Sequence, residues 1–401
     1  MDLHTNHPYW LMKNGSVMDY PALETDIETD IAILGSGISG ALAAYYLYRD
    51  DLKVTILDKR RAGTGSTAAS TSLLQYELDV PLYELAGKVG KKNAIHAYKM
   101  CREAISDLRQ ICKKLRTDTG FKLRPSLQYA SDLKHRHGLY REFGMRLKSG
   151  FRVNWLDSAE VEKLFGFSTP GAILSEEAAE VDPYLLTHAL LAYVRQKQYG
   201  VYDNTEVTGI TYDNNRIFLK TAADHTVKAR KLIVAAGYET LSYLPNPMAE
   251  LYSTYALVSE PIPHEGDFWY QNSLIWETGK PYMYMRTTDD GRLLIEGKDD
   301  PFTSAAARDA KLKNKTAQLV QSFSSRFPHL RIRPEYAWAG TFASTDDGLP
   351  YIGSIPGMPD TYFSLGVGGN GIVFGVIAAQ LIRDMIRGRT NRESEIFSFN
   401  R

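Results

Sequence analysis

Hydrophobic residues follow a pattern that predicts alternating buried strands and helices. Mostly apolar segments at 31–34, 54–57 and 227–234 have the length of buried strands. After the first of them, small and apolar residues recur at helical spacing. A further strand near 362–365 ends in a glycine cluster and precedes another helical stretch. This order predicts an α/β fold.

Between residues 250 and 335 the pattern changes to alternation from one residue to the next. Tyr282 and Tyr284 fall on one face of such a strand, and Met283 and Met285 fall on the other. A turn at 289–291 leads to a second strand at 292–296, which predicts an antiparallel sheet. Helices are expected at 81–114, 157–164, 184–199 and 305–323.

Composition limits the classes of function. The chain has 401 residues, of which 44% are hydrophobic and 23% charged, and its 47 acidic and 47 basic residues balance. This length predicts about two domains, and the balanced charge argues against a nucleic-acid or anionic-lipid partner. The first residues do not resemble a signal peptide, and no stretch resembles a membrane span. We therefore expect a cytoplasmic protein with no integral membrane segment.

The histidines and cysteines predict neither a metal site nor a covalent cofactor link. His135 and His137 are two positions apart, a spacing that does not place both on one helical face. Cys101 and Cys112 fit one helical stretch, in which their Cα atoms would be about 16 Å apart. That distance excludes a disulfide, so we interpret both as reduced thiols.

The first glycine-rich segment has the chemistry of a dinucleotide-binding turn. Gly35, Gly37 and Gly40 follow the first strand directly, and Asp58 ends the second strand. In such a unit the first glycine allows a tight turn, the second lets the backbone approach a pyrophosphate, and the third lets the helix pack on the sheet. The helix N-terminus offers N–H groups to the pyrophosphate. The carboxylate accepts hydrogen bonds from ribose hydroxyls and would repel the 2′-phosphate of an NADP-type ligand.

A run of small residues, many with hydroxyl groups, follows the second strand from Gly65 to Thr71. Such a run is either a flexible linker or a cofactor-binding segment whose hydroxyl and N–H groups bond the ligand. Because it follows the ribose-binding acid, we favour a cofactor role for Ser66, Thr67 and Ser70.

Five glycine-containing motifs occur in order along the chain. They are the glycine turn with Asp58, Gly65-Ser66-Thr67, Val234-Ala235-Ala236-Gly237, Asp347-Gly348-Leu349-Pro350-x-Ile352-Gly353 and Gly366-x-Gly368-Gly369-x-Gly371-Ile372. With these motifs the chain resembles the FAD-dependent oxidoreductases of the D-amino-acid-oxidase-like (DAO) superfamily, which includes glycine and sarcosine oxidases and D-amino-acid dehydrogenases. The resemblance extends from residue 31 to about residue 385.

The resemblance implies a discontinuous Rossmann-like domain that binds FAD non-covalently, and a second domain whose antiparallel sheet covers the flavin, so that the fold is α+β overall. It divides the chain into an arm at 1–27, a FAD domain at 28–85, 150–248 and 336–401, and a substrate domain at 86–149 and 249–335. The helix after the last glycine cluster would direct its N-terminus at the flavin and stabilise the charge of reduction. The cofactor-binding residues implied are Gly35, Gly37, Ile38, Ser39, Gly40, Asp58, Lys59, Gly65, Ser66, Thr67, Ser70, Thr71, Val207, Ala236, Gly237, Gly340, Gly368, Gly369, Asn370, Gly371 and Ile372.

One departure from the superfamily concerns the substrate. Many members that oxidise amino acids have Gly-Leu-Arg-Pro after a tryptophan, and its arginine holds the substrate carboxylate. Here the sequence is Gly340-Thr341-Phe342-Ala343. Arg286 is either a substitute for that arginine or part of a structural ion pair. Glu77 is either a group that accepts a proton or pairs with an ammonium ion, or a structural carboxylate. The residues expected at the catalytic site are Tyr76, Glu77, Tyr284, Arg286 and Phe342.

These observations predict an FAD-dependent enzyme that transfers a hydride from a small amine or amino-acid-like molecule to N5 of the flavin. O2 or another acceptor would then take the electrons. Because the arginine is missing, oxidation of a C–OH bond in a polyol or 2-hydroxy acid is the main alternative. A flavin-binding protein without turnover is the third.

Overall fold

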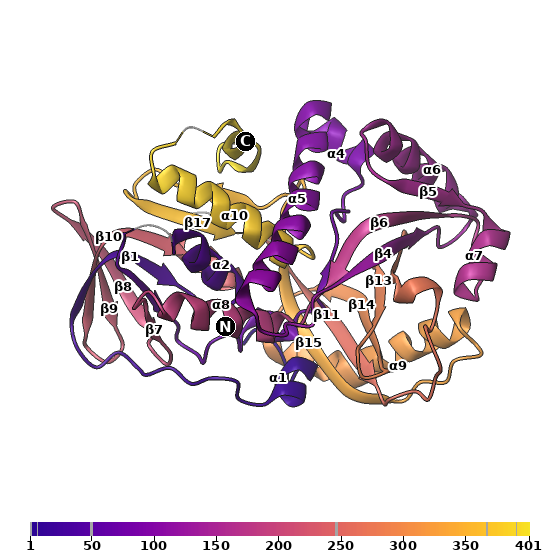
Figure 1. The fold of residues 1–401 in the computed structure, drawn as a ribbon, viewed down its shortest axis with the longest axis horizontal. Coiled ribbons are helices and arrows are strands. Elements are labelled where there is room, and N and C mark those ends of the chain that lie inside the picture. Colours follow the sequence, from indigo (N-terminus) through magenta and orange to yellow (C-terminus); the bar gives the residue numbers. More distant parts are fainter. Residues whose placement is uncertain (1, 6, 49–50, 245–247, 366–367, 390) are drawn as a thin grey trace.

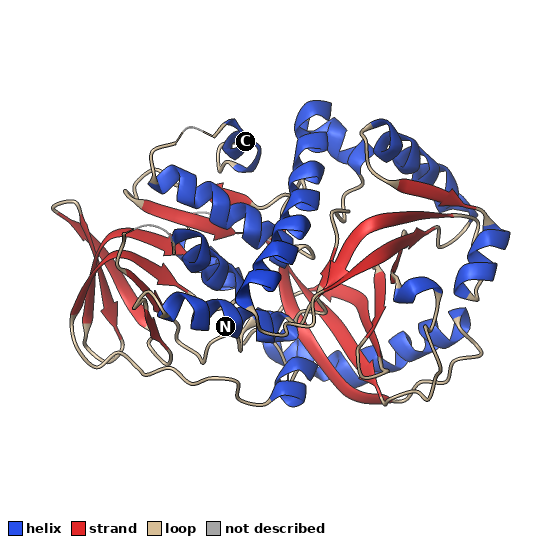
Figure 2. Cartoon of the chain, viewed as in Figure 1, coloured by secondary structure: helices blue, strands red, loops and turns tan. Residues whose placement is uncertain are grey.

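The computed structural model describes residues 2–5, 7–48, 51–244, 248–365, 368–389 and 391–401. Within these residues, two sheets of eight and nine strands lie next to each other, with helices packed against them (Figure 1). Figure 2 shows the two groups of strands, with most helices packed around them. None of the described helices is long and apolar enough to cross a bilayer.

The first sheet has the parallel core of an α/β fold. Its strands are β1 (Ile27–Leu34), β2 (Val54–Leu57), β7 (Gly200–Tyr202), β8 (Val207–Asp213), β9 (Arg216–Thr221), β10 (Thr226–Val234), β16 (Tyr351–Gly353) and β17 (Thr361–Leu365). Strands β17, β10, β1, β2 and β7 are parallel neighbours, and β16 and β9 add antiparallel partners. The predicted α/β fold is therefore confirmed.

Helices cover one face of this sheet. They are α2 (Ile38–Leu47), α5 (Lys91–Leu115), α8 (Pro183–Arg195) and α10 (Gly371–Ile386). Their apolar side chains form one core with Ile31, Ile33 and Ile56. The alternate residues Ala32 and Leu34 face the other side, where they pack with side chains of β9 and β10. Burial on both faces explains why these strands are so apolar.

The second sheet confirms the predicted alternation. Its strands are β3 (Leu73–Leu74), β4 (Lys122–Tyr129), β5 (Val153–Leu156), β6 (Ala172–Glu180), β11 (Glu250–Ser259), β12 (Leu274–Glu277), β13 (Met283–Thr287), β14 (Leu293–Pro301) and β15 (Pro334–Ser344). They pair antiparallel, except that β12 and β4 are parallel. Met283 and Met285 pack in a core with residues of α9 (Ala305–Arg326). Tyr282 and Tyr284 lie on the opposite face of β13, which is turned toward the first sheet.

The remaining helical segments are short or lie at the periphery. They are α1 (Tyr9–Asn14), α3 (Ser66–Ala69), α4 (Leu82–Val89), α6 (Leu133–Lys148), α7 (Ser158–Phe165), and the 3₁₀ segments η1 (Gly237–Tyr243), η2 (Tyr270–Asn272) and η3 (Arg392–Phe397). The helical pattern at 81–114 is two helices, separated at Gly90, whose φ of +84° favours glycine. Asp157 caps α7 through a capping box, as its sequence suggests.

The structure corrects the expected division into domains. Strands β5 and β6, placed by the sequence in the FAD domain, pair with each other, and β6 pairs with β4 in the second sheet. Strand β15 pairs with β11 over its whole length, so residues 336–344 also belong there. Helix α5, expected in the substrate domain, packs against α10 on the first sheet. The sheet to which each segment belongs depends on pairing between strands that are far apart in the sequence. The local hydrophobic pattern does not contain that information.

The N-terminal arm is attached to the edge of the second sheet. The backbone N–H of Thr5 donates to the carbonyl of Ala339 (2.9 Å), and the N–H of Thr341 donates to the carbonyl of Leu3 (3.0 Å). Further along the arm, the indole N–H of the buried Trp10 donates to the carbonyl of Ser70 (2.7 Å). These bonds cover the edge of β15 and fix the segment after α3.

Candidate functional site

A cavity of about 720 Å³ opens between the two sheets, a size within the usual range of ligand sites. All but one of the residues expected to bind the cofactor line it. Those residues are Gly35, Gly37, Ile38, Ser39, Asp58, Lys59, Gly65, Ser66, Thr67, Ser70, Thr71, Val207, Ala236, Gly237, Gly340, Gly368, Gly369, Asn370, Gly371 and Ile372. The exception is Gly40, which lies behind the turn.

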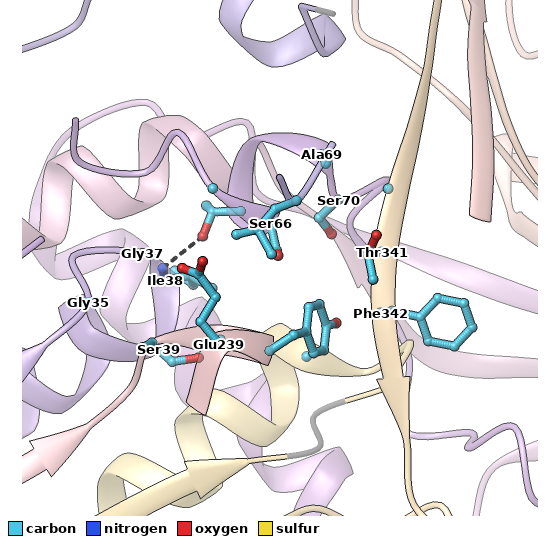
Figure 3. A pocket seen from close by; sticks show the side chains of 18 of the residues that line it. Gly35, Gly37, Ile38, Ser39, Ser66, Ala69, Ser70, Glu239, Thr341 and Phe342 are labelled. Atoms are coloured by element: carbon cyan, nitrogen blue, oxygen red, sulfur yellow. Dashed lines mark hydrogen bonds between the residues drawn. The ribbon is translucent and has the colours of Figure 1, made fainter. Parts of the chain in front are cut away.

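The turn between β1 and α2 forms one end of the cavity (Figure 3). Gly35 has a φ of +104°, and a Cβ there would lie 2.4 Å from the carbonyl oxygen of Ala235. A Cβ on Gly40 would lie 1.9 Å from the carbonyl oxygen of Gly35. Both positions therefore require glycine, the first for the turn and the second for the contact between helix and turn.

The segment after β2 is folded onto the start of α2. Figure 3 shows the hydrogen bond in which the N–H of Ile38 donates to Oγ1 of Thr67 (3.0 Å). The Oγ atom of Ser66 is buried at the cavity without a hydrogen-bond partner. Residues 66–69 form a helical turn, so the linker interpretation is wrong. The N-cap residue of α2 is Gly37, which has no side chain to cap the helix. Apart from the N–H of Ile38, the N–H groups of the first turn are therefore left for a phosphate.

Asp58 connects the end of β2 to the glycine turn. Its Oδ2 atom accepts hydrogen bonds from the N–H (2.7 Å) and hydroxyl (2.9 Å) of Ser36, and its Oδ1 atom accepts one from the N–H of Arg60 (2.9 Å). Burial raises the pKa of this carboxyl, and the three donors oppose that rise. Oδ1 keeps a lone pair that can accept a hydrogen bond from a ribose hydroxyl.

The start of α10 forms another wall. The side-chain amide of Asn370 donates to the carbonyls of Gln75 (2.9 Å) and Glu77 (3.0 Å), which joins this wall to the segment after β3. The N-terminus of α10 thereby faces the cavity with its partial positive charge. Gly366, the first glycine of the expected motif, lies outside the described residues.

The second sheet supplies the roof of the cavity. Tyr284 lines it as predicted, and Phe342 lines it on β15. Figure 3 shows the Phe342 ring on the side of β15 that faces away from the turn at Gly35, where it stacks on Tyr252 with ring centres 5.6 Å apart. Sequence reasoning missed the other roof residues, which are Asp79, Thr254, Trp276, Tyr282, Glu296 and Asp299. The alternating pattern of the two strands that contain Tyr282 and Glu296 was the sequence signal that could have placed these two side chains at the roof.

Two expected catalytic residues do not line the cavity. Tyr76 is buried in the core, where its ring stacks on Phe151 with centres 4.7 Å apart. Arg286 donates to the carbonyl of Ser72 (3.0 Å) and lies 3.8 Å from Oε2 of Glu180. It is 4% exposed and packs over the ring of Trp10. Arg286 is therefore a structural residue, and it does not replace the missing carboxylate-binding arginine.

Glu77 lines the cavity and is only 3% exposed. Neither carboxylate oxygen has a hydrogen-bond partner among the described residues, and the nearest cation is the buried guanidinium of Arg146, at 3.7 Å. Burial raises the pKa of Glu77, and the charge of Arg146 lowers it. The side chain therefore connects the cavity to a buried ionic network.

The parallel sheet, its glycine turn and the cavity that the second sheet covers form a dinucleotide-binding site of the Rossmann type. Residues 30–385 match the family described as FAD dependent oxidoreductase (DAO), and the chain belongs to that family.

Individual relatives are similar over nearly the whole chain. The chain is 24% identical to glycine oxidase of Bacillus licheniformis over 92% of this chain and 96% of that protein. Its fold is similar to the crystal structure of glycine oxidase from Geobacillus kaustophilus, with a TM-score of 0.77, 20% identity and coverage of 91% and 96% of the two chains. It is also similar to dithionite-reduced L-α-glycerophosphate oxidase from Mycoplasma pneumoniae with FAD bound, with a TM-score of 0.76, 18% identity and coverage of 90% and 95%.

The residues present fit FAD, the cofactor of this family. Gly37 lines the cavity without a side chain and so leaves room for a pyrophosphate against the backbone. Asp58 has capacity for a ribose hydroxyl, and the Oγ of Ser66, which has no hydrogen-bond partner, can donate to the ligand. Cys101 and Cys112 are not among the lining residues, which fits non-covalent binding. The chain is thus an FAD-dependent oxidoreductase.

Replacing Asp58 with alanine should weaken FAD binding about 10- to 100-fold. The change removes a charged acceptor, and the loss of one hydrogen bond to a charged group has an effect of this size. Titration of the apoprotein with FAD, followed by quenching of flavin fluorescence, measures the affinity. Glu28→Ala, at the exposed far end of β1, is the control and should bind FAD like the unmodified chain. Equal affinities for all three proteins would exclude the role given to Asp58.

Proposed function

We propose that the enzyme oxidises a carbon–nitrogen bond of a small amine. The observation that carries this proposal is the charge of the cavity roof, where Glu77, Asp79, Glu296 and Asp299 are lining residues. Lys59 and Arg60 are the basic residues among the described lining residues, and both pair with Glu239 at the nucleotide end. A 2-hydroxy acid would meet like charge at this roof, whereas an amine meets acceptors. The similarity to glycine oxidases supports the same conclusion.

Bound FAD supplies a two-electron acceptor at N5. The C–H bond next to nitrogen breaks with its electron pair, the nitrogen lone pair forms the C=N bond, and water converts the imine to a carbonyl and an amine. The nitrogen must be neutral to supply that lone pair. Glu77, which has no hydrogen-bond partner and a raised pKa, is our candidate to accept the ammonium proton.

Anaerobic mixing of the FAD-loaded enzyme with matched substrate classes tests this proposal. Monoamines, diamines, N-methyl amino acids, D-amino acids, polyols and 2-hydroxy acids are compared by the loss of flavin absorbance. We expect amines to bleach the flavin, and readmission of air then distinguishes O2 from another electron acceptor. Bleaching by polyols or hydroxy acids alone would overturn the proposal.

A further inference from the structure

Three carboxylates lie together at the roof. Glu296 and Asp299 come from β14, and Asp79 comes from the segment between β3 and α4. Burial raises the pKa of Asp299 to about 7, and the charges of Glu296 and Asp79 add to the rise. Neutral hydroxyls are their hydrogen-bond donors: those of Thr71 and Thr254 to Glu296, and that of Tyr284 to Asp79.

A β-bulge directs two of these carboxylates to the same side. Glu296 and Asp299 are three positions apart, so in a regular strand they would face opposite sides. Between the pairs Ser253–Asp300 and Tyr255–Gly297, however, β14 contains one residue more than β11. Gly297 and Lys298 have φ values of +145° and +60° there. The extra residue turns both carboxylates into the cavity.

Three aromatic rings line the cavity with these carboxylates. Trp276 and Tyr284 are stacked with ring centres 5.9 Å apart, and Tyr282 meets them edge-on at 6.2 and 6.0 Å. Aromatic faces attract organic ammonium ions, and cages of this composition bind alkylated ammonium groups. We call this group of three rings and three carboxylates the roof cluster.

One acceptor of the roof cluster, Oδ1 of Asp299, is buried without a hydrogen-bond partner. An ammonium group can donate to it, whereas the unpaired indole N–H of Trp276 is itself a donor and needs an acceptor. Buried polar atoms in folded proteins nearly always have partners, so atoms left unpaired in a cavity indicate where a ligand or water binds. Among the described cavity-lining residues, no cation lies at the roof: Lys315, on α9, pairs with Asp300 outside the cavity.

From this combination we infer that the roof cluster binds a second ammonium group of the substrate, so that the substrate is a diamine or polyamine without a carboxylate. One nitrogen is held by the carboxylates and aromatic faces, while the carbon next to the other nitrogen is oxidised. This inference rests on the proposed amine oxidation and adds the substrate class. It also gives a reason for the absent carboxylate-binding arginine, because a polyamine has no carboxylate to hold.

The first test compares substrates of matched length on the FAD-loaded enzyme. Under anaerobic conditions, 1,4-diaminobutane should bleach the flavin at concentrations about 10- to 100-fold lower than butylamine or 4-aminobutanoate, the range expected for one hydrogen bond to a charged group. Equal half-saturation for the diamine and the monoamine would overturn the roof cluster as an ammonium site, while the proposed amine oxidation would stand.

The second test uses Asp299→Asn and a binding probe that is not turned over. Tetramethylammonium carries a fixed charge and no N–H group, so charge and the aromatic faces alone would hold it. It should compete with the diamine, with an affinity that falls about tenfold or more in the variant. Glu28→Gln is the control, because Glu28 lies at the exposed far end of β1, away from the cavity, and this variant should bind tetramethylammonium and the diamine like the unmodified chain. FAD content, measured in parallel, shows that each variant is folded. An unchanged affinity in Asp299→Asn would overturn the inference.

The pH dependence of the same probe gives an independent readout. Asp299 is faced by Glu296 on its own strand, Asp79, Thr254 on β11, and Lys315 on α9. Its raised pKa means that the carboxylate ionises as the pH rises through about 7, so affinity for tetramethylammonium should rise from pH 6 to pH 8 and the rise should be smaller in Asp299→Asn. If only polyols bleach the flavin, the proposed oxidation fails, and probe binding still reports on the roof cluster.

Discussion

Replacing Gly40 with alanine should yield a protein that contains no FAD and has lost about 3 kcal/mol or more of unfolding free energy. The new Cβ would lie 1.9 Å from the carbonyl oxygen of Gly35, and a backbone atom cannot rotate away as a side chain can. Either α2 or the turn must move, which costs free energy and removes the N–H groups that face the pyrophosphate. Absorbance at flavin wavelengths per chain and the urea unfolding midpoint measure the two effects.

Gly144→Ala is the control for that substitution. Gly144 lies within α6, where an added Cβ has no heavy atom within 4 Å. Alanine is favoured over glycine inside a helix by up to about 1 kcal/mol, so this variant should keep its FAD and be equally or slightly more stable. A Gly40→Ala protein that matched it in FAD content would contradict the packing described for the glycine turn.

The second large effect is expected at the buried ionic network behind the cavity. Arg146 is fully buried and donates to Oε1 of Glu142 (2.6 Å) and to the side-chain oxygen of Gln128 (2.8 Å), with Glu77 3.7 Å away. Arg146→Met would leave two carboxylates without their cation. Removing one partner from a buried pair costs about 3–5 kcal/mol, and denaturant unfolding should show a loss of that size.

A double variant separates charge from shape at this network. Glu142→Gln, combined with Arg146→Met, removes one of the two uncompensated charges. The N–H groups of Leu82 and Tyr83 donate to different oxygens of Glu142 (3.0 and 3.1 Å), so the amide oxygen keeps one of these two hydrogen bonds. The double variant should therefore be more stable than Arg146→Met alone. If it is less stable, the loss in the single variant comes from packing and not from an unpaired charge.

The nucleotide half of the site was readable from the sequence because its residues are neighbours along the chain. The residues from Gly35 to Ser39 leave one strand and begin one helix, so their spacing determines their geometry. Asp58 could be placed because β2 is the parallel neighbour of β1. The order of the motifs indicated the family. Residues near both chain ends line the same cavity, as that order implied.

The roof could not be predicted in the same way. Its position depends on the pairing of β12, β13 and β14, and on a bulge that reverses the alternation between Glu296 and Asp299. Tyr76 fails as a catalytic residue for a related reason: it follows Gln75, which faces the cavity, and its own side chain points into the core. Arg286 shares a face with Tyr284, but the N-terminal arm covers it through Trp10. Strand pairing, and contacts with segments far away in the sequence, determine which of these side chains reach the cavity.

One measurement tests the proposed reaction most directly. The amine that reduces the flavin fastest is prepared with deuterium on the carbon atoms next to nitrogen and mixed anaerobically with the FAD-loaded enzyme. Because the C–H bond next to nitrogen breaks as the flavin is reduced, bleaching should be several-fold slower than with the unlabelled amine, and the carbonyl product should have lost one deuterium from the oxidised carbon. Bleaching at the same rate, with both deuterium atoms kept in the product, would contradict the account.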